Sequence, residues 1–158
     1  MEKELKEIIE ESRKSLKKTE EKIEDISEDF SQEVSEVWNE LKKRLSGVEE
    51  KLKDAYVNFE DKAELKGHLA MMEARDRLEL IKESTEKFVQ KANTKAQEGL
   101  DIASLKAHLA KMESEDLWDE KRETLSHMYA ESKIEVEKLA KKAGKEINTI
   151  FLKLTEIM

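Results

Sequence analysis

The chain has 158 residues, of which 43% are charged, 37% hydrophobic and 5% aromatic, with a net charge of −8 and no cysteine. A composition this polar excludes a thick globular core and leaves two classes, disordered chains and long helices that bury a narrow apolar stripe. The acidic balance argues against nucleic-acid binding, and the absence of cysteine excludes disulfides, zinc thiolate sites and thiol nucleophiles.

The first predicted helix spans residues 2–57. The chain has no proline and four glycines, and its apolar residues recur every three or four positions, which favours helices over disorder. Ser12 and Thr19 fill two polar steps of this stripe. The spacing is that of a left-handed coiled coil as far as Phe30 and then becomes an eleven-residue rhythm. Gly47 does not interrupt the stripe, so the helix continues through it at a cost of about 1 kcal/mol.

Two breaks are predicted further along the chain. At residues 58–61 the stripe loses phase, and Asn58 and Asp61 supply helix-stop and N-cap chemistry. At residues 97–102, Gly99 suits the left-handed position that ends a helix. We therefore predict an all-α fold of long, antiparallel, coiled-coil-like helices, a single-domain three-helix bundle with overhanging ends. Its predicted helices span residues 2–57, 61–97 and 102–157.

An internal repeat with a spacing of 40 residues relates residues 63–76 to residues 103–116. Within it, "LKGHLAMME" at 65–73 matches "LKAHLAKME" at 105–113. Duplication of a helix, or of a helix and a turn, is the simplest explanation. The shared LKxHLAxME box resembles one in uncharacterised bacterial coiled-coil-domain proteins. That resemblance implies a bacterial coiled coil and no activity.

Each copy of the box carries histidine, methionine and glutamate, which are all metal-binding residue types. His68 and Met72 lie one helical turn apart, as do His108 and Met112, but a metal site needs three or four converging ligands. In a three-helix bundle each box starts its helix, so the two histidines lie at opposite ends of the bundle, separated by the length of a helix of roughly 55 Å. We therefore interpret the box as a packing unit whose imidazole flanks the apolar seam with its polar edge in water, and we predict no metal and no cofactor.

Two further pairs of residues are functional candidates. Trp38 and Trp118 occur at coiled-coil spacing, so we interpret them as filling wide layers of the seam rather than stacking a ligand. Asp76 and Asp116 fall beside the stripe, where they either fix the helix register or lie on its rim. The sequence has no nucleophile elbow, phosphate-binding glycine loop or HExxH motif, so we predict no enzyme activity and no small-molecule substrate.

The segment "KLAKKAGKEINTIFLKLTEIM", residues 138–158, is the candidate interaction site. Four lysines precede a dense apolar cluster there. Three roles fit this pattern: ordinary bundle core, self-association, or a membrane surface with the lysines near anionic headgroups. The candidate residues are Lys138, Lys141, Lys142, Lys145, Ile147, Ile150, Phe151, Leu152, Leu154 and Ile157.

Unequal helix lengths leave residues 1–20 and 139–158 overhanging opposite ends of the predicted bundle. Exposed apolar stripes on such ends predict a homodimer or higher oligomer, or pairing with another helical protein. We expect a structural or scaffolding role through helix–helix contacts, with a lipid- or membrane-surface-binding bundle as the alternative. No apolar run is long enough for a signal peptide or a membrane span, so we expect a cytoplasmic protein.

Overall fold

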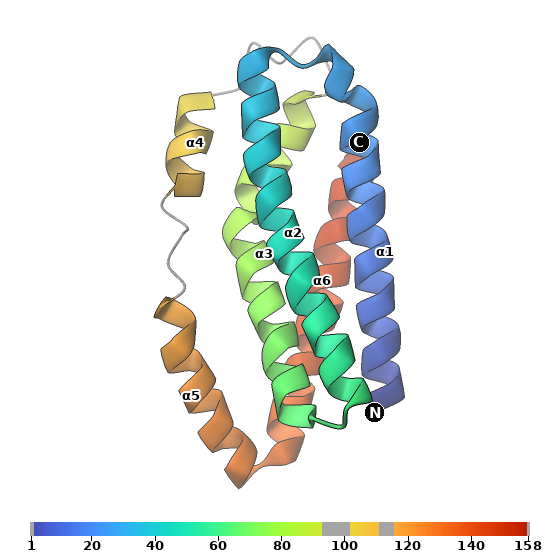
Figure 1. Cartoon of the computed structure of the whole chain (residues 1–158), viewed down its shortest axis with the longest axis vertical. Helices are drawn as coiled ribbons and strands as arrows, with labels where there is room; N and C mark the ends of the chain where they lie inside the picture. The colour runs from blue at the N-terminus through green and yellow to red at the C-terminus, as the bar shows by residue number, and fades with distance from the viewer. Residues whose placement is uncertain (1, 93–101, 111–115, 158) are drawn as a thin grey trace.

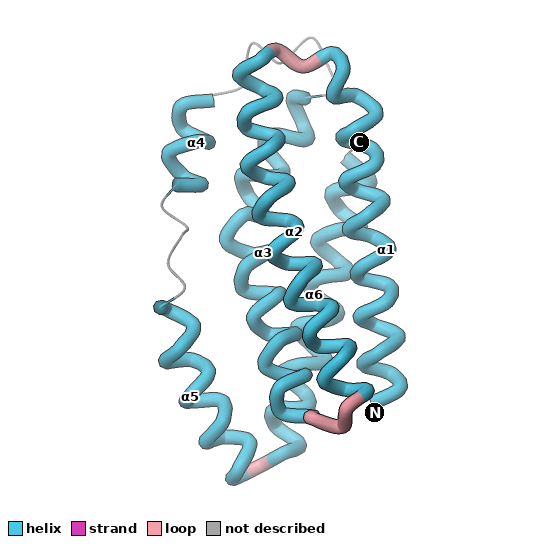
Figure 2. The backbone as a smooth tube through the Cα atoms, in the orientation of Figure 1, coloured by secondary structure: helices cyan, strands magenta, loops and turns pink. Residues whose placement is uncertain are grey.

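The computed structural model describes residues 2–92, 102–110 and 116–157, and all regular secondary structure in these residues is helical (Figure 1). Short loops join α1 to α2, α2 to α3 and α5 to α6 (Figure 2). The elements, in chain order, are α1 (Glu2–Ile26), a short 3₁₀ turn η1 (Ser27–Asp29), α2 (Gln32–Glu60), α3 (Glu64–Ala92), α4 (Ile102–Ala110), α5 (Asp116–Glu131) and α6 (Lys133–Ile157).

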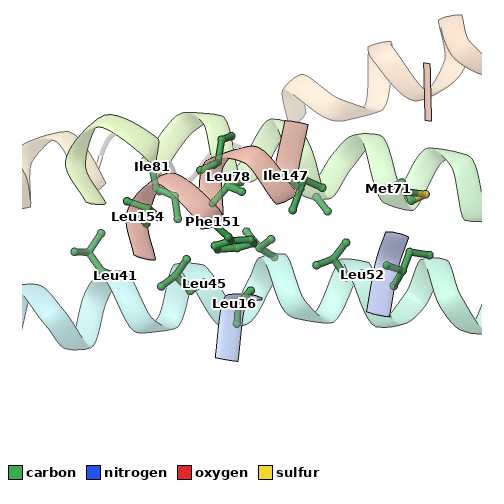
Figure 3. Close-up of a cluster of buried hydrophobic side chains, with 14 of the residues drawn as sticks. Leu16, Leu41, Leu45, Leu52, Met71, Leu78, Ile81, Ile147, Phe151 and Leu154 are labelled. Atoms are coloured by element: carbon green, nitrogen blue, oxygen red, sulfur yellow. The ribbon is translucent and has the colours of Figure 1, made fainter. Parts of the chain in front are cut away.

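Four helices, α1, α2, α3 and α6, surround one continuous apolar core. α1 packs against α2 and α6, and α3 packs against the same two helices. α2 runs antiparallel to α1 and α3, whereas α6 runs parallel to both (Figure 1). Figure 3 shows Leu16, Leu45, Leu78 and Phe151, one from each helix, pointing into the space that the helices enclose. The three-helix bundle expected from the sequence is not confirmed, because the N-terminal part of the chain supplies two helices.

The structure replaces the single helix predicted over residues 2–57 by two antiparallel helices. After η1, Phe30 and Ser31 are extended (φ −75°, ψ 138° and φ −64°, ψ 165°). Ser31 caps α2, since its hydroxyl oxygen accepts a hydrogen bond from the backbone N–H of Val34 at 3.2 Å. Phe30 meets Phe88 of α3 edge to face, with 5.7 Å between the ring centroids. The apolar stripe stays in phase through this turn, so periodicity alone did not mark it.

The turn between α2 and α3 lies next to the predicted break at residues 58–61. Lys62 has a φ of 62°, and the N–H of Ala63 donates to the carbonyl of Asn58 at 2.8 Å. A left-handed residue of this kind ends a helix and satisfies its last carbonyls. Gly67, in the first turn of α3, then lies against Phe59, where a Cβ would be only 2.6 Å from the ring.

The C-terminal part of the chain is not the single helix predicted over residues 102–157. α5 ends at Glu131, Ser132 is not helical, and α6 starts in a new direction (Figure 2). The N–H of Ser132 donates to the carbonyl of Met128 at 2.7 Å. α5 packs on α3 and α6, and α4 packs on α2 and α3. The predicted break at Gly99 lies outside the described residues.

Candidate functional site on helix α6

The predicted interaction residues of the C-terminal segment divide between the core and the surface. Leu152 is 60% exposed, and Lys138, Lys142 and Lys145 are also exposed. Lys141 is partly buried, and the side chain of Ile157 lies outside the described residues. The four remaining apolar residues are buried in the four-helix core: Ile147, Ile150, Phe151 and Leu154 (Figure 3).

Helix α1 covers this apolar face of α6 along most of its length. Residues 1–20 and 139–158 were predicted to overhang. Their described parts, residues 2–20 and 139–157, instead pack on each other within one chain. The turn at residues 27–31 is the physical reason, because it folds α1 back alongside the bundle. Three polar contacts mark the register: Glu4 with Lys141 (2.8 Å), the Ser12 hydroxyl with Oδ1 of Asn148 (2.6 Å), and Nζ of Lys22 with the carbonyl of Thr155 (3.4 Å).

The buried stripe of α1 contains two hydroxyl groups in place of apolar side chains. Ser12 and Thr19 are both fully buried. The Thr19 hydroxyl donates to the carbonyl of Ser15 at 2.9 Å, and that of Ser12 lies 2.9 Å from the carbonyl of Ile8. The Thr19 hydroxyl is satisfied within its helix, and that of Ser12 by its helix and by Asn148, but each side chain buries less apolar surface than leucine would. α1 is therefore held on the bundle by a narrow, interrupted stripe.

Helix α5 covers a second face of α6, and the adjoining face of α3, through a separate apolar cluster that we call the α5 interface. Lys121 and Arg122 both lie 5.8 Å from the ring centroid of Trp118, over its face. The buried residues of the α5 interface are Leu69, Met72, Trp118, Leu125, Val136 and Ala143, with Leu65, Met128, Tyr129 and Leu139 partly buried.

Buried and half-buried carboxylates of α3 surround the α5 interface. The Glu73 side chain is 7% exposed and forms ion pairs with Lys51 of α2 (3.1 Å), Arg77 of α3 (3.2 Å) and Arg122 of α5 (3.6 Å). Asp76 pairs with Lys121 of α5 in the same way. Burial of a carboxylate is unfavourable unless cations compensate it, so these pairs tie α5 to the bundle.

His68, the histidine of the first box, is 1% exposed and lies among α2, α3 and α5. Its ring centroid is 5.2 Å from that of Phe59 and 6.3 Å from that of Tyr129. Neither ring nitrogen has a hydrogen-bond partner among the described residues. Burial lowers the pKa of His68 to about 4, an effect that Glu64 opposes and Lys133 reinforces. The sequence predicted a wet polar edge for this ring, and the structure instead buries a neutral imidazole.

Glu64, one turn before His68, connects three helices. Its carboxylate accepts hydrogen bonds from the ammonium of Lys133 in α6 and from the Tyr129 hydroxyl of α5 at 3.4 Å. The bond from Lys133 is the largest of the influences that lower the pKa of Glu64. Sequence reasoning singled out neither Lys133 nor Tyr129, because no periodicity relates residues near 65 to residues near 130.

The two copies of the repeated box have different neighbours where the structure describes them. Leu65 joins the α5 interface, whereas its counterpart Leu105, on α4, is buried against the four-helix core. The side chains of His108 and Met112 lie outside the described residues. Trp38 is also in the four-helix core. Within residues 2–92, 102–110 and 116–157, no group of three or more potential ligands is placed to hold a metal ion.

No protein-family model, curated protein or solved structure matches the chain. None of the helices in the described ranges is both long enough and apolar enough to cross a membrane. The contacts of α6 with α1 and α5 therefore supply the structural basis for a functional proposal.

Proposed function

We propose that the chain is a non-enzymatic structural or scaffolding protein that acts through helix–helix contacts with other protein chains. The observation that carries the proposal is the apolar face of α6. On this face Ile147, Phe151 and Leu154 bury completely or almost completely against neighbouring helices. Burial of such a stripe supplies affinity, and ion pairs along its rim select the register and the partner.

The partner that fits this face is a second copy of the chain. Each chain carries both halves of the contact, the apolar face of α6 and the stripe of α1 that covers it. The rim charges are also matched, since Lys141 of α6 pairs with Glu4 of α1 and this pairing lowers the pKa of Glu4. We therefore propose a homodimer or higher oligomer built from coiled-coil-like helix pairs.

Light scattering combined with size-exclusion chromatography, from low to high micromolar protein, tests the proposal. The expected result is a mass that rises with concentration from one chain towards two. A strict monomer at the highest concentration would contradict the proposal. Leu152→Ser is the matched control, because Leu152 is exposed outside both apolar clusters and its loss should leave the mass unchanged. Loss of association in this variant would mean that the contact between chains lies on the exposed edge of α6.

Binding to a membrane surface is the alternative role. Because the apolar residues of α6 face inward, both roles require a rearrangement. Self-association requires only α1 to leave α6, whereas lipid binding requires the four-helix core to open. Co-sedimentation with vesicles rich in anionic lipid separates the two roles. We expect the protein to stay in the supernatant with unchanged fluorescence from Trp38 and Trp118. Co-sedimentation together with a loss of the bundle's cooperative unfolding would favour the lipid role instead.

A further inference from the structure

We infer that two copies of the chain exchange α1: the turn between α1 and α2 straightens, and α1 of each copy packs on α2 and α6 of the other. The inference rests on the proposed function and deepens it, because it names α1 as the element that makes the contact. Four observations support it: the residues of the turn, the connection of α1, the helix directions and the stripe of α1.

The residues of the turn are compatible with one continuous helix. No glycine and no proline occurs before Gly47, so no residue type forces the backbone to bend. Ser31 is the side chain that specifies the turn, through its cap on Val34. The apolar stripe continues through the turn at steps of three, four, four and three, and a helix from Glu2 to Glu60 would present it on one face. The residues of this stripe are Ile23, Ile26, Phe30, Val34 and Val37.

The other two turns of the described fold each differ from this one, but for different reasons. The turn between α2 and α3 contains Lys62 at a φ of 62°, which no helix contains, and the stripe loses phase there. The turn at Ser132 also keeps the stripe in phase, but α5 is linked at its other end to α4, which packs on α2 and α3. In the described residues, 2–92, 102–110 and 116–157, the turn at residues 27–31 joins α1 to the helices that follow it.

The helix directions allow the exchanged contacts to be the same as those within one chain. α1 is antiparallel to α2 and parallel to α6 (Figure 1). If α1 continues in the direction of α2, a second copy related by a two-fold axis at the turn presents its own α2 antiparallel and its own α6 parallel to that α1. Glu4 then meets Lys141, and Ser12 meets Asn148, across the two chains.

The stripe of α1 favours release from its own bundle. Thr19 bonds to a carbonyl of its own helix, so this bond persists when α1 leaves. Ser12 also bonds to Asn148 of α6, and that bond is lost on release and formed again between the two chains. Only the turn itself distinguishes the two forms: the folded-back form keeps the Ser31 cap and the contact of Phe30 with Phe88, and the straight form gains helical backbone bonds. The apolar contacts of α1 are present in both forms.

Substitutions at the turn test the exchange in the full chain. Gln32 is exposed and is the first residue of α2, where proline is favourable, and Ser31 before it already has the extended backbone that proline requires. Gln32→Pro therefore preserves the folded-back form, but in a continuous helix proline would break a backbone bond. We expect the dissociation constant of the dimer to rise roughly a hundredfold or more. Gln32→Ala is the matched control and should leave the dimer intact.

Ser31→Ala gives the opposite change at the same turn. It removes the cap on Val34 and places a strong helix former in the turn, so we expect the dissociation constant to fall roughly fivefold or more. Circular dichroism of each variant verifies that the helices form before its mass is compared with that of the unmodified chain.

A cross-linking experiment identifies which α1 lies on which α6. The chain contains no cysteine, so single substitutions introduce unique labels. A Glu4→Cys chain is mixed with a Lys141→Cys chain that carries a length tag, and a short bismaleimide is added. Because each chain carries one thiol, a product joining the two kinds of chain requires α1 of one chain to lie on α6 of the other.

The expected result is this mixed product, increased by Ser31→Ala, retained with Gln32→Ala and abolished by Gln32→Pro. A dimer mass without the mixed product, or a dimer unaffected by Gln32→Pro, overturns the exchange and leaves the proposed function standing. A strict monomer for every variant overturns both.

Discussion

Helix α6 is covered on two faces, and the two covers differ in kind. α1 lies over an apolar face that belongs to the continuous four-helix core, with isolated polar contacts along the register. α5 lies over a smaller cluster bordered by buried carboxylates, their cations and a neutral histidine. Apolar burial is insensitive to pH, whereas paired charges and an unpartnered imidazole are not. The contact of α1 with α6 therefore contributes stability that does not depend on pH, whereas the contact of α5 can be weakened by a change of pH.

Truncation of one buried residue in each apolar cluster is expected to have the largest effect. Phe151 is fully buried in the four-helix core, so Phe151→Ala should lower the free energy of unfolding by about 3–5 kcal/mol. Leu125 is buried only in the α5 interface, and Leu125→Ala should detach α5 and leave the four-helix core in place. This variant should therefore lose only the free energy with which α5 packs on α3 and α6.

The two tryptophans report separately on the two covers. Trp38 lies in the four-helix core and Trp118 lies in the α5 interface, so Trp38→Phe and Trp118→Phe each leave one probe. Urea titrations of Leu125→Ala in these backgrounds should show the Trp118 transition well before the Trp38 transition. Coincident transitions would mean that α5 and the bundle unfold as one unit, and the distinction between the covers would fail.

Acid should weaken the α5 interface through His68. Its pKa in the folded protein, about 4, lies below its ordinary value of 6.5, so the unfolded chain binds the extra proton first. The free energy of unfolding therefore falls as pH drops from 6.5 towards 4, by up to about 3 kcal/mol. The charged and titratable groups that face the ring are Glu64 on α3, Tyr129 on α5 and Lys133 on α6.

Urea unfolding between pH 7 and pH 4 measures this slope, and His68→Leu should remove most of it. Glu64 acts in a lower window, since the bond from Lys133 lowers its pKa and its contribution is lost only as pH falls below its ordinary value of 4.5. Burial raises the pKa of Glu20, so protonation of this carboxylate as pH falls favours the folded state, which is the opposite of the effect of Glu64. An equal slope in wild type and His68→Leu between pH 6.5 and 5 would contradict the assignment to His68.

The same residues explain how much of the fold could be predicted from sequence. The break near Asn58 was visible because the stripe lost phase, and the all-helical class followed from the periodicity. The turns at Ser31 and Ser132 were not visible, because serine occurs both inside helices and at their ends. Ser12 remains in a helix and bonds to the carbonyl of Ile8, whereas Ser31 caps the start of α2. Only tertiary contacts, such as that of Phe30 with Phe88, select between them.

The sequence predicted which residues form the candidate site, but not which helices those residues contact. The apolar cluster around Phe151 could be found by its density, but whether it meets α1 of the same chain depends on the turn at residues 27–31. The ion pairs of Glu73 and Asp76 with α5 join residues more than 40 positions apart, and no local spacing encodes them.

Gly144 lies at the close contact of α1, α3 and α6, and Gly47 on α2 provides a comparison outside it. A Cβ at Gly144 would lie 2.5 Å from Cγ2 of Ile8 and 2.7 Å from Cε of Met71, so Gly144→Ala should destabilise the bundle by about 1–3 kcal/mol. Gly47→Ala is the control, because its Cβ would meet only the Arg77 guanidinium at 3.5 Å. That variant should stabilise the fold by up to about 1 kcal/mol through helix propensity. Thermal unfolding compares the two, and equal shifts would mean that α1 does not pack tightly on α6.

The smallest expected effect comes from Glu73, and it tests the charged cover alone. Glu73→Gln keeps the shape of the side chain and removes its charge, leaving Lys51, Arg77 and Arg122 without their shared partner. Since these cations are 26–48% exposed, water stabilises them, and we expect a loss of about 1 kcal/mol rather than the several that an isolated buried charge would produce. Amide hydrogen exchange should show the loss in α5, whose Arg122 is released. Faster exchange across α1 instead would mean that Glu73 stabilises the four-helix core. The packing of α1 and of α5 on α6 would then be coupled through α3.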